Sequence, residues 1–111
     1  LVYKATRVVN IAIGEMLSAG QPLQFCRRDP ASAEADMRRM LRALKARAPR
    51  PKGGVYYSCV GRGPNLFGAK SGELRIIQEE LGDLPLTGFY CNGEISHNRL
   101  YGYTGVLTLF L

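Results

Sequence analysis

The clearest hydrophobic pattern in the chain lies between residues 29 and 48. Apolar residues recur there with the spacing of one face of an α-helix. They are Ala33, Met37, Met40, Leu41, Leu44 and Ala48. Asp29 is a residue type that caps helix N-termini, and Pro30 suits the first helical position. The sequence therefore predicts a helix over 30–48 whose apolar stripe, with both methionines, packs in the core.

Two further segments read as buried strands separated by a helix. The runs 55–60 and 86–91 are rich in β-branched and aromatic residues, as is typical of strands. Between them, residues 73–81 show helical spacing of apolar positions. The inner stripe of this second helix is predicted to be Leu74, Ile77 and Leu81. Two strands joined through a helix form a parallel βαβ unit with a right-handed crossover.

Three shorter runs complete the predicted sheet. The runs 8–13 and 23–26 flank turn residues at 20–22 and suggest a hairpin or an edge pair. A last strand, 106–111, follows the loop 92–105 and is compatible with an antiparallel neighbour. The fold class is thus α/β, with the order ββαβαββ, a mixed sheet, a central parallel βαβ unit and two main helices.

Composition places the chain among ordinary globular domains. It has 111 residues, of which 46% are hydrophobic and 22% are charged, so we expect a single domain over residues 1–111 with a small core. No apolar run is long enough to span a membrane and no signal-peptide pattern is evident. The chain begins at Leu1, and we expect it to be the C-terminal part of a longer protein. Three cysteines without CxxC spacing favour a reducing, cytoplasmic setting.

The positive charge is concentrated on the first helix and its flanks. Residues 27–52 hold nine basic and three acidic residues, so they account for the net charge of +6. Arg38, Arg42 and Lys45 share one helix face, which we interpret as a solvated face. No aromatic residue is present in this window to stack on bases, so nucleic-acid binding is not expected.

Two strand ends carry the most specific chemistry. The first ends in Cys59-Val60-Gly61-Arg62-Gly63, and the second ends in Cys91-Asn92-Gly93-Glu94. The carboxyl ends of parallel neighbours lie side by side, which is where α/β folds bind ligands. Neither stretch fits a phosphate-binding loop, because the GxxxxGK[ST] and GxGxxG patterns are missing.

The charged residues at these ends suggest a ligand. A guanidinium at Arg62 can bind a carboxylate or phosphate with a two-pronged contact, and Glu94 can accept an amino group. Together they offer the charge pattern that holds an amino acid zwitterion. The alternative, left open, is that Arg62 and Glu94 pair with each other. The predicted ligand-binding residues are Cys59, Gly61, Arg62, Gly63, Asn92, Gly93 and Glu94.

Catalysis is weakly indicated. His97 is the single histidine, and a Cys–His hydrolase would need its imidazole within hydrogen-bond reach of Cys59 or Cys91. One histidine and scattered thiols also do not form a metal-site pattern. We therefore expect no enzyme activity, no metal and no cofactor.

The same residues, in the same order, resemble a known family. The stretches from Ser58 to Gly68 and from Gly88 to Ile95, with a helix starting near Glu73, are similar to the FIST C-terminal domain. The strand 20–25 and the tail 100–107 are similar to it as well. The resemblance covers roughly residues 11–111, and its specificity comes from the order and spacing of the pieces.

The resemblance implies an intracellular sensory role in signal transduction. FIST domains (F-box and intracellular signal transduction proteins) are regarded as modules that bind small ligands, with amino acids proposed. It also implies an N-terminal FIST half in the same protein and a signalling partner. One alternative is a protein-interaction module that uses a sheet edge or the basic helix. A Cys–His hydrolase is the less favoured alternative.

Overall fold

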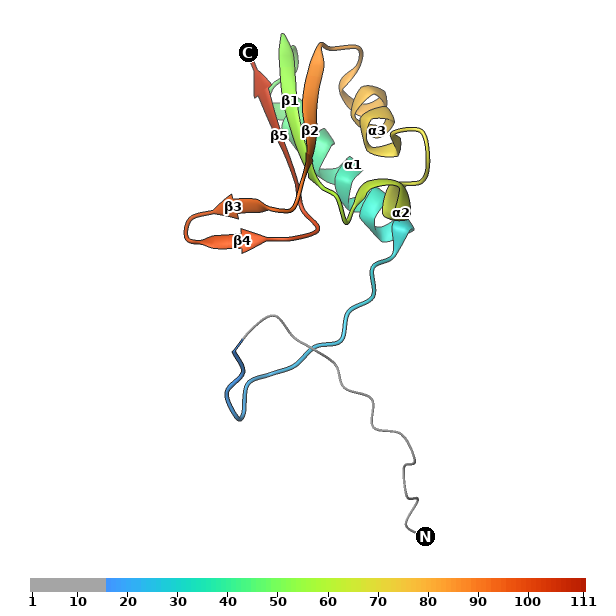
Figure 1. The fold of residues 1–111 in the computed structure, drawn as a ribbon. Helices are drawn as coiled ribbons and strands as arrows, with labels where there is room; N and C mark the ends of the chain where they lie inside the picture. Colours follow the sequence, from blue (N-terminus) through green and yellow to red (C-terminus); the bar gives the residue numbers. More distant parts are fainter. Residues whose placement is uncertain (1–15) are drawn as a thin grey trace.

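A computed structural model describes residues 16–111 of the chain (Figure 1). Three helices and five strands are assigned within this range. They are α1 (Pro30–Arg47), β1 (Gly53–Cys59), α2 (Gly63–Phe67), α3 (Gly72–Leu81), β2 (Leu86–Cys91), β3 (Glu94–Ser96), β4 (Arg99–Tyr101) and β5 (Gly105–Phe110). The strand predicted over 8–13 lies outside the described residues.

The main sheet has three strands in the order β2-β1-β5. Strands β1 and β2 are parallel, and their register brings Cys59 opposite Cys91. Strand β5 runs antiparallel to β1. The helices lie on one side of this sheet, and the two-stranded β3–β4 hairpin projects away from them (Figure 1). The α/β class and the parallel βαβ unit are confirmed.

Helix α1 begins where its capping residues predict. The side chain of Asp29 accepts a hydrogen bond from the backbone N–H of Ser32 at 2.8 Å, and proline occupies the first turn. Met37 and Leu41 are buried in the core. Met40 was predicted to lie in the core but is 55% exposed. The stripe of side chains that α1 buries against the sheet is narrower than the set of apolar positions in its sequence.

Helix α3 is rotated relative to the prediction. Ile76 and Ile77 are its fully buried side chains, whereas Leu74 is 42% exposed. With Tyr56 of β1 and the two buried residues of α1, the isoleucines form the core between the helices and the sheet. The rotation has a consequence for the site, because it also carries Glu73 inward, where it is 3% exposed.

Three other predictions about the elements need correction. Residues 23–26 do not form a strand but an exposed, extended segment, because no described strand lies beside them to accept their backbone hydrogen bonds. The loop predicted after β1 contains helix α2, which Pro64 initiates. The loop 92–105 contains the β3–β4 hairpin.

Candidate functional site

A buried carboxylate joins helix α3 to strand β1. The Oε1 atom of Glu73 accepts hydrogen bonds from the Tyr56 hydroxyl and from Arg62 Nε, each at 2.7 Å, and Oε2 accepts one from Ser58 Oγ at 2.8 Å. Tyr56 and Ser58 alternate on the face of β1 that the helices cover, so both reach the first turn of α3. These four side chains form the Glu73 cluster.

Burial makes the Glu73 cluster costly to disrupt. An unpaired carboxylate in the interior carries a large desolvation penalty, which Arg62 offsets through an ion pair whose side chains are 16% and 4% exposed. Burial raises the pKa of Tyr56, and its hydrogen bond to Glu73 raises it further. Burial by itself lowers the pKa of Arg62, but the hydrogen bond and charge of Glu73 outweigh it, so this pKa is raised overall. Arg62 is therefore a fixed cation.

Arg62 is held by three groups from different elements. Besides the Nε contact with Glu73, its guanidinium carbon lies 4.7 Å from the ring centroid of Phe67 in α2. Its Nη1 atom makes a long contact of 3.4 Å with the carbonyl oxygen of Tyr103. A guanidinium has further N–H donors beyond those used in these contacts. The predicted alternative in which Arg62 pairs with Glu94 is wrong, because Arg62 pairs with Glu73.

A groove lies on each side of the cluster, and Tyr56 lines both. The first, between α3 and β2, has a volume of about 350 Å³ and includes Ser58, Glu73, Leu74 and Tyr90 in its wall. The second, between α1 and β5, also has a volume of about 350 Å³. Its wall includes Asp36, Met37, Met40, Leu44, Arg62 and Leu107. Arg62 is thus the predicted site residue that reaches a groove.

The predicted strand ends do lie together. Cys59 and Cys91 are opposite each other in the parallel register. Cys59 is buried and Asn92 is exposed at the bend after β2. Glu94 does not meet Arg62: its Oε1 accepts from the Cys91 thiol at 3.2 Å, and its Oε2 accepts from the Thr104 hydroxyl. The second strand end is thus tied to the base of the hairpin.

The glycines of these loops allow close packing. A Cβ atom added at Gly61 would lie 2.5 Å from the ring of Tyr103, so a larger residue here would have to displace this ring. Arg28 donates to the carbonyl oxygen of Gly61 at 3.1 Å and lies over the same ring. Gly63 is buried near Tyr90, and Gly93 has a φ of +150° beside the carbonyl of Tyr101. Protein side chains and backbone therefore account for the close approaches at the glycine-rich strand ends.

The thiol and imidazole groups are engaged elsewhere. Burial raises the pKa of the Cys91 thiol, and its hydrogen bond to Glu94 adds to the effect. His97 lies in the turn of the hairpin, where its Nδ1 is 3.2 Å from Ser96 Oγ. Neither contact joins a thiol to the imidazole. Within residues 16–111, no three His, Cys, Asp or Glu side chains gather so as to hold a metal ion.

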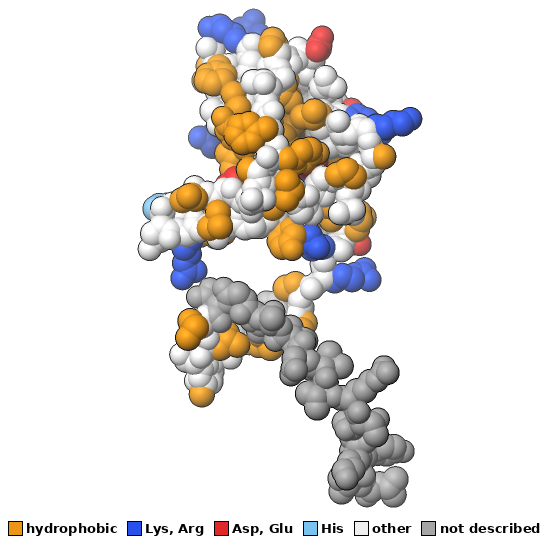
Figure 2. All heavy atoms as spheres, viewed as in Figure 1, with side chains coloured by type: hydrophobic (Ala, Val, Ile, Leu, Met, Phe, Trp, Pro, Cys, Tyr) orange, Lys and Arg blue, Asp and Glu red, His pale blue; other side chains and the backbone are white. Residues whose placement is uncertain are grey.

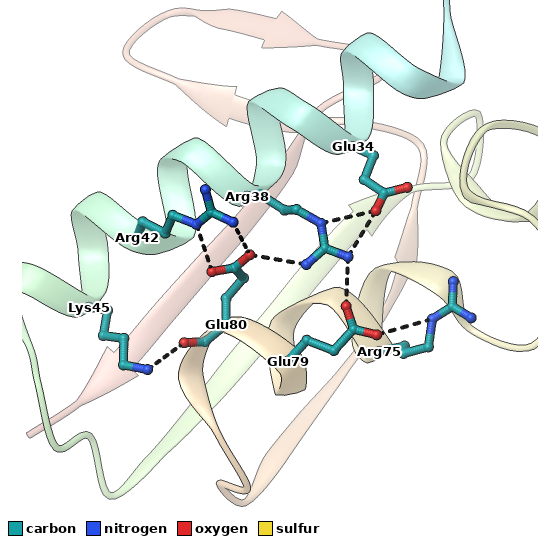
Figure 3. Close-up of polar contacts among 7 residues, drawn as sticks. All are labelled: Glu34, Arg38, Arg42, Lys45, Arg75, Glu79 and Glu80. Atoms are coloured by element: carbon teal, nitrogen blue, oxygen red, sulfur yellow. Dashed lines mark hydrogen bonds and ion pairs between the residues drawn. The ribbon is translucent and has the colours of Figure 1, made fainter.

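A second set of charges connects α1 and α3 (Figure 3). Arg38 contacts Glu34, Glu79 and Glu80 at 2.8, 2.6 and 3.0 Å. Arg42 contacts Glu80 at 2.9 Å, and Lys45 donates to the Glu80 carbonyl at 2.7 Å. The helix face that the sequence suggested to be solvated is therefore an interface with α3.

Sequence reasoning missed the residues at the centre of the cluster. Glu73 was noted as the start of a helix, and Tyr56 and Ser58 as strand residues, without a role in the site. A signal was present, because Tyr56 and Ser58 share one strand face and a carboxylate opens the following helix. Their partnership with Arg62 depends on the rotation of α3, which periodicity fixes only to within about a residue.

The amino-acid sequence matches a known family and several longer proteins. The family model described as FIST C domain matches residues 3–97. An uncharacterized Mycobacterium tuberculosis protein, Rv0628c, is 39% identical over 106 residues, which cover 91% of this chain and 28% of the relative. A Mycobacterium bovis protein, Mb0898c, is 37% identical over 107 residues, with coverage of 92% and 28%.

The chain thus spans about 28% of the length of the curated relatives it matches. No solved structure matches it significantly. Among the described residues, no helix is long and apolar enough to cross a membrane. With the family model covering most of its length, the chain belongs to the FIST C domain family of signal-transduction proteins.

Proposed function

We propose that this FIST C domain is the ligand-binding part of an intracellular sensor, and that its ligand is a small polar molecule such as an amino acid. The observation that supports this most is the position of Arg62. Glu73 and Phe67 hold its guanidinium from within the fold, and the same side chain lines the groove between α1 and β5. A fixed cation on a groove wall suits the carboxylate of a ligand.

The groove between α1 and β5 has the chemistry of a small-molecule site. Its volume of about 350 Å³ lies in the range of ligand pockets, which are mostly apolar with a few polar groups. Met37, Met40 and Leu107 would contact the apolar part of the ligand. Methionine adapts its shape to different partners, so this wall suits a sensor that tolerates variation in the ligand side chain.

Asp36 offers a contact for the amino group. It lines the same groove, and its present partner is Arg39, at 2.6 Å in an exposed pair along the helix. Exposed pairs of this kind are weak, so a ligand ammonium can replace Arg39. In this arrangement Asp36 takes the role that the sequence suggested for Glu94.

The proposed setting is cytoplasmic and the proposed role is non-catalytic. The proposed partners are the small ligand, an N-terminal FIST half in the same protein and a signalling protein that binds the ligand-bound form. The family supports signal transduction at this level.

A thermal-shift screen of the full chain with the common amino acids tests the proposal. A ligand at 100 times its Kd should stabilise the fold by about 2.7 kcal/mol. The shift should be lost with Met40→Asp, which puts an anion in the groove at an exposed position, and kept with Gln78→Asp on the outer face of α3. If no amino acid raises the melting temperature, the proposed ligand class is wrong.

The second candidate is a protein-interaction module. The basic helix face suggested for this role is engaged by Glu79 and Glu80 of α3, which leaves little free charge for a partner. The sheet is different, because no other segment within residues 16–111 covers the side that faces away from the helices. This observation favours an interaction role for the sheet and none for the basic face of α1.

A further inference from the structure

The side of the sheet that faces away from the helices is mostly apolar, with threonines as its polar residues and no charge. The register of the three strands places alternate residues on this face. They include Val55, Tyr57, Phe89, Val106, Thr108 and Phe110. Phe89 is 65% exposed and Phe110 is 55% exposed. Figure 2 shows hydrophobic side chains gathered over the strands on the side in view.

An open face of this kind is unusual for the sheet it belongs to. Parallel strands are normally covered on both faces when the whole sheet is parallel, and β1 and β2 form a parallel pair beside the antiparallel β5. The chain carries 22% charged residues, yet the six residues above include none. Exposed apolar patches of this kind mark interaction surfaces. The pattern indicates a face that is covered in the functional protein.

The hairpin extends this surface. Strands β3 and β4 project from the sheet on the side away from the helices (Figure 1). Ile95 and Leu100 face each other in the hairpin and are 77% and 68% exposed. An isolated two-stranded hairpin is at best marginally stable in water. The sheet face and the two exposed apolar side chains of the hairpin are together called the open cradle here.

We propose that the open cradle binds another segment of the same polypeptide, one that presents an apolar, uncharged layer of its own. Proteins similar to this chain are much longer, and the matched region is 28% of their length. Two sheets that pack face to face do so through such apolar faces, about 10 Å apart. The result is a layered arrangement with α1 and α3 on the outside.

The size of the face favours a covalently linked occupant over a second copy. The sheet part of the cradle has three strands of six or seven residues, which at about 4.8 Å between strands and about 3.3 Å per residue cover roughly 300 Å². A stable complex of separate chains buries about 800 Å² per partner. A linked segment avoids most of the association cost of about 4–15 kcal/mol, so a smaller area is sufficient. The net charge of +6 also opposes the approach of a second copy.

Cysteine labelling in the complete translation product that carries this chain tests the proposal. Thr108→Cys places a thiol in the middle of the open face, and Gln78→Cys places one on the exposed outer face of α3. Maleimide labelling of the native protein is followed by mass spectrometry of the peptide that holds each new cysteine. We expect Cys at 108 to react at least tenfold more slowly than Cys at 78, at a rate independent of protein concentration.

Each other outcome overturns the proposal. Similar rates at the two positions show that the face is open in the complete product, including the case in which the product is this chain alone. Protection that disappears on dilution, together with a dimer mass by light scattering, identifies a second copy as the occupant. Melting temperatures of both variants within a few degrees of the unchanged protein confirm that the labelling reports on folded molecules.

Discussion

Helix α3 carries two sets of carboxylates that lie in opposite environments. Glu73, in the first turn, is buried and accepts three hydrogen bonds from Tyr56, Ser58 and Arg62. Glu79 and Glu80, near the end of the helix, pair with Arg38 and Arg42 at the edge of the α1–α3 interface, where Glu79 and Arg42 are 46% and 67% exposed and Glu80 is 12% exposed. The number of ion pairs is larger at the surface. The stability of the fold depends more on the buried carboxylate than on the more numerous ion pairs of Glu79 and Glu80.

The physical reason lies in what remains when a partner is removed. At the surface, water solvates the remaining charge, and exposed pairs contribute roughly 0.2–1 kcal/mol each. In the interior, the remaining charge stays without solvent, and breaking a buried pair costs about 3–5 kcal/mol. The Glu73 cluster therefore works as a rigid support for Arg62, while the α1–α3 network adjusts the packing of two helices.

The largest expected effect is that of Glu73→Ala. It leaves Arg62 buried beside two hydroxyls without a carboxylate, so we expect a loss of about 3–5 kcal/mol in the free energy of unfolding. Urea denaturation followed by circular dichroism measures it. The matched control is Glu79→Ala on the same helix, with an expected loss of about 1 kcal/mol or less. Equal losses would show that the two sets of carboxylates do not differ.

Tyr56→Phe should have the next largest effect. It removes one hydrogen bond to a buried carboxylate and keeps the ring in the core, which costs about 1.5–3 kcal/mol. Tyr57→Phe is the control, because Tyr57 points to the open face of the same strand and should change the stability by only a few tenths of that amount. A smaller loss for Tyr56→Phe than for Tyr57→Phe, by the same denaturation assay, would contradict the role of the cluster.

Arg42→Ala should have a small effect that depends on salt. Its side chain is 67% exposed, and its pair with Glu80 is open to screening by ions. We expect a loss of roughly 0.2–1 kcal/mol at low ionic strength, reduced further at 1 M NaCl. A loss above about 2 kcal/mol, or one that salt does not reduce, would mean that the ion pairs between α1 and α3 are as important for stability as the Glu73 cluster.

The pH dependence of stability separates the two sets in another way. Hydrogen bonds from Arg42 and Arg38 lower the pKa of Glu80 from 4.5 to about 2. The unfolded state therefore binds more protons between these values, and this contribution is complete above about pH 4.5 and is lost as the pH falls toward 2. Melting temperatures between pH 6 and pH 2.5 should fall less steeply for Glu80→Gln. Parallel curves for the two proteins would exclude this contribution.

The sequence was sufficient for elements that rest on local physics. Asp29 and Pro30 predicted the start of α1, and the composition of 55–60 and 86–91 predicted the parallel pair. It failed where the structure depends on a distant neighbour. Residues 23–26 have strand-like composition but no neighbouring strand among the described residues. The hairpin 94–101 was read as a loop because each of its strands is only three residues long.

In the candidate site, too, the sequence predicted local features and missed contacts with distant residues. The sequence placed Arg62 at the end of the first strand and left open whether it pairs with Glu94, whereas the structure pairs it with Glu73. Adjacent loops suggested the pairing with Glu94, whereas the rotation of α3 by about one residue brings Glu73 to Arg62. Periodicity favoured Leu74 as the inward residue, and only the packing of Ile76 and Ile77 against Tyr56 shows which side of α3 is buried.

In the proposed site, Arg62, supported by Glu73, contacts the carboxylate of the ligand. Isothermal titration calorimetry of the unchanged chain and of Arg62→Lys, with the amino acid that gives the largest thermal shift, measures this most directly. Lysine keeps the charge and loses the planar two-pronged contact. We predict a Kd at least tenfold higher for Arg62→Lys with its folded circular dichroism spectrum preserved. An unchanged Kd in a folded Arg62→Lys variant would contradict the account.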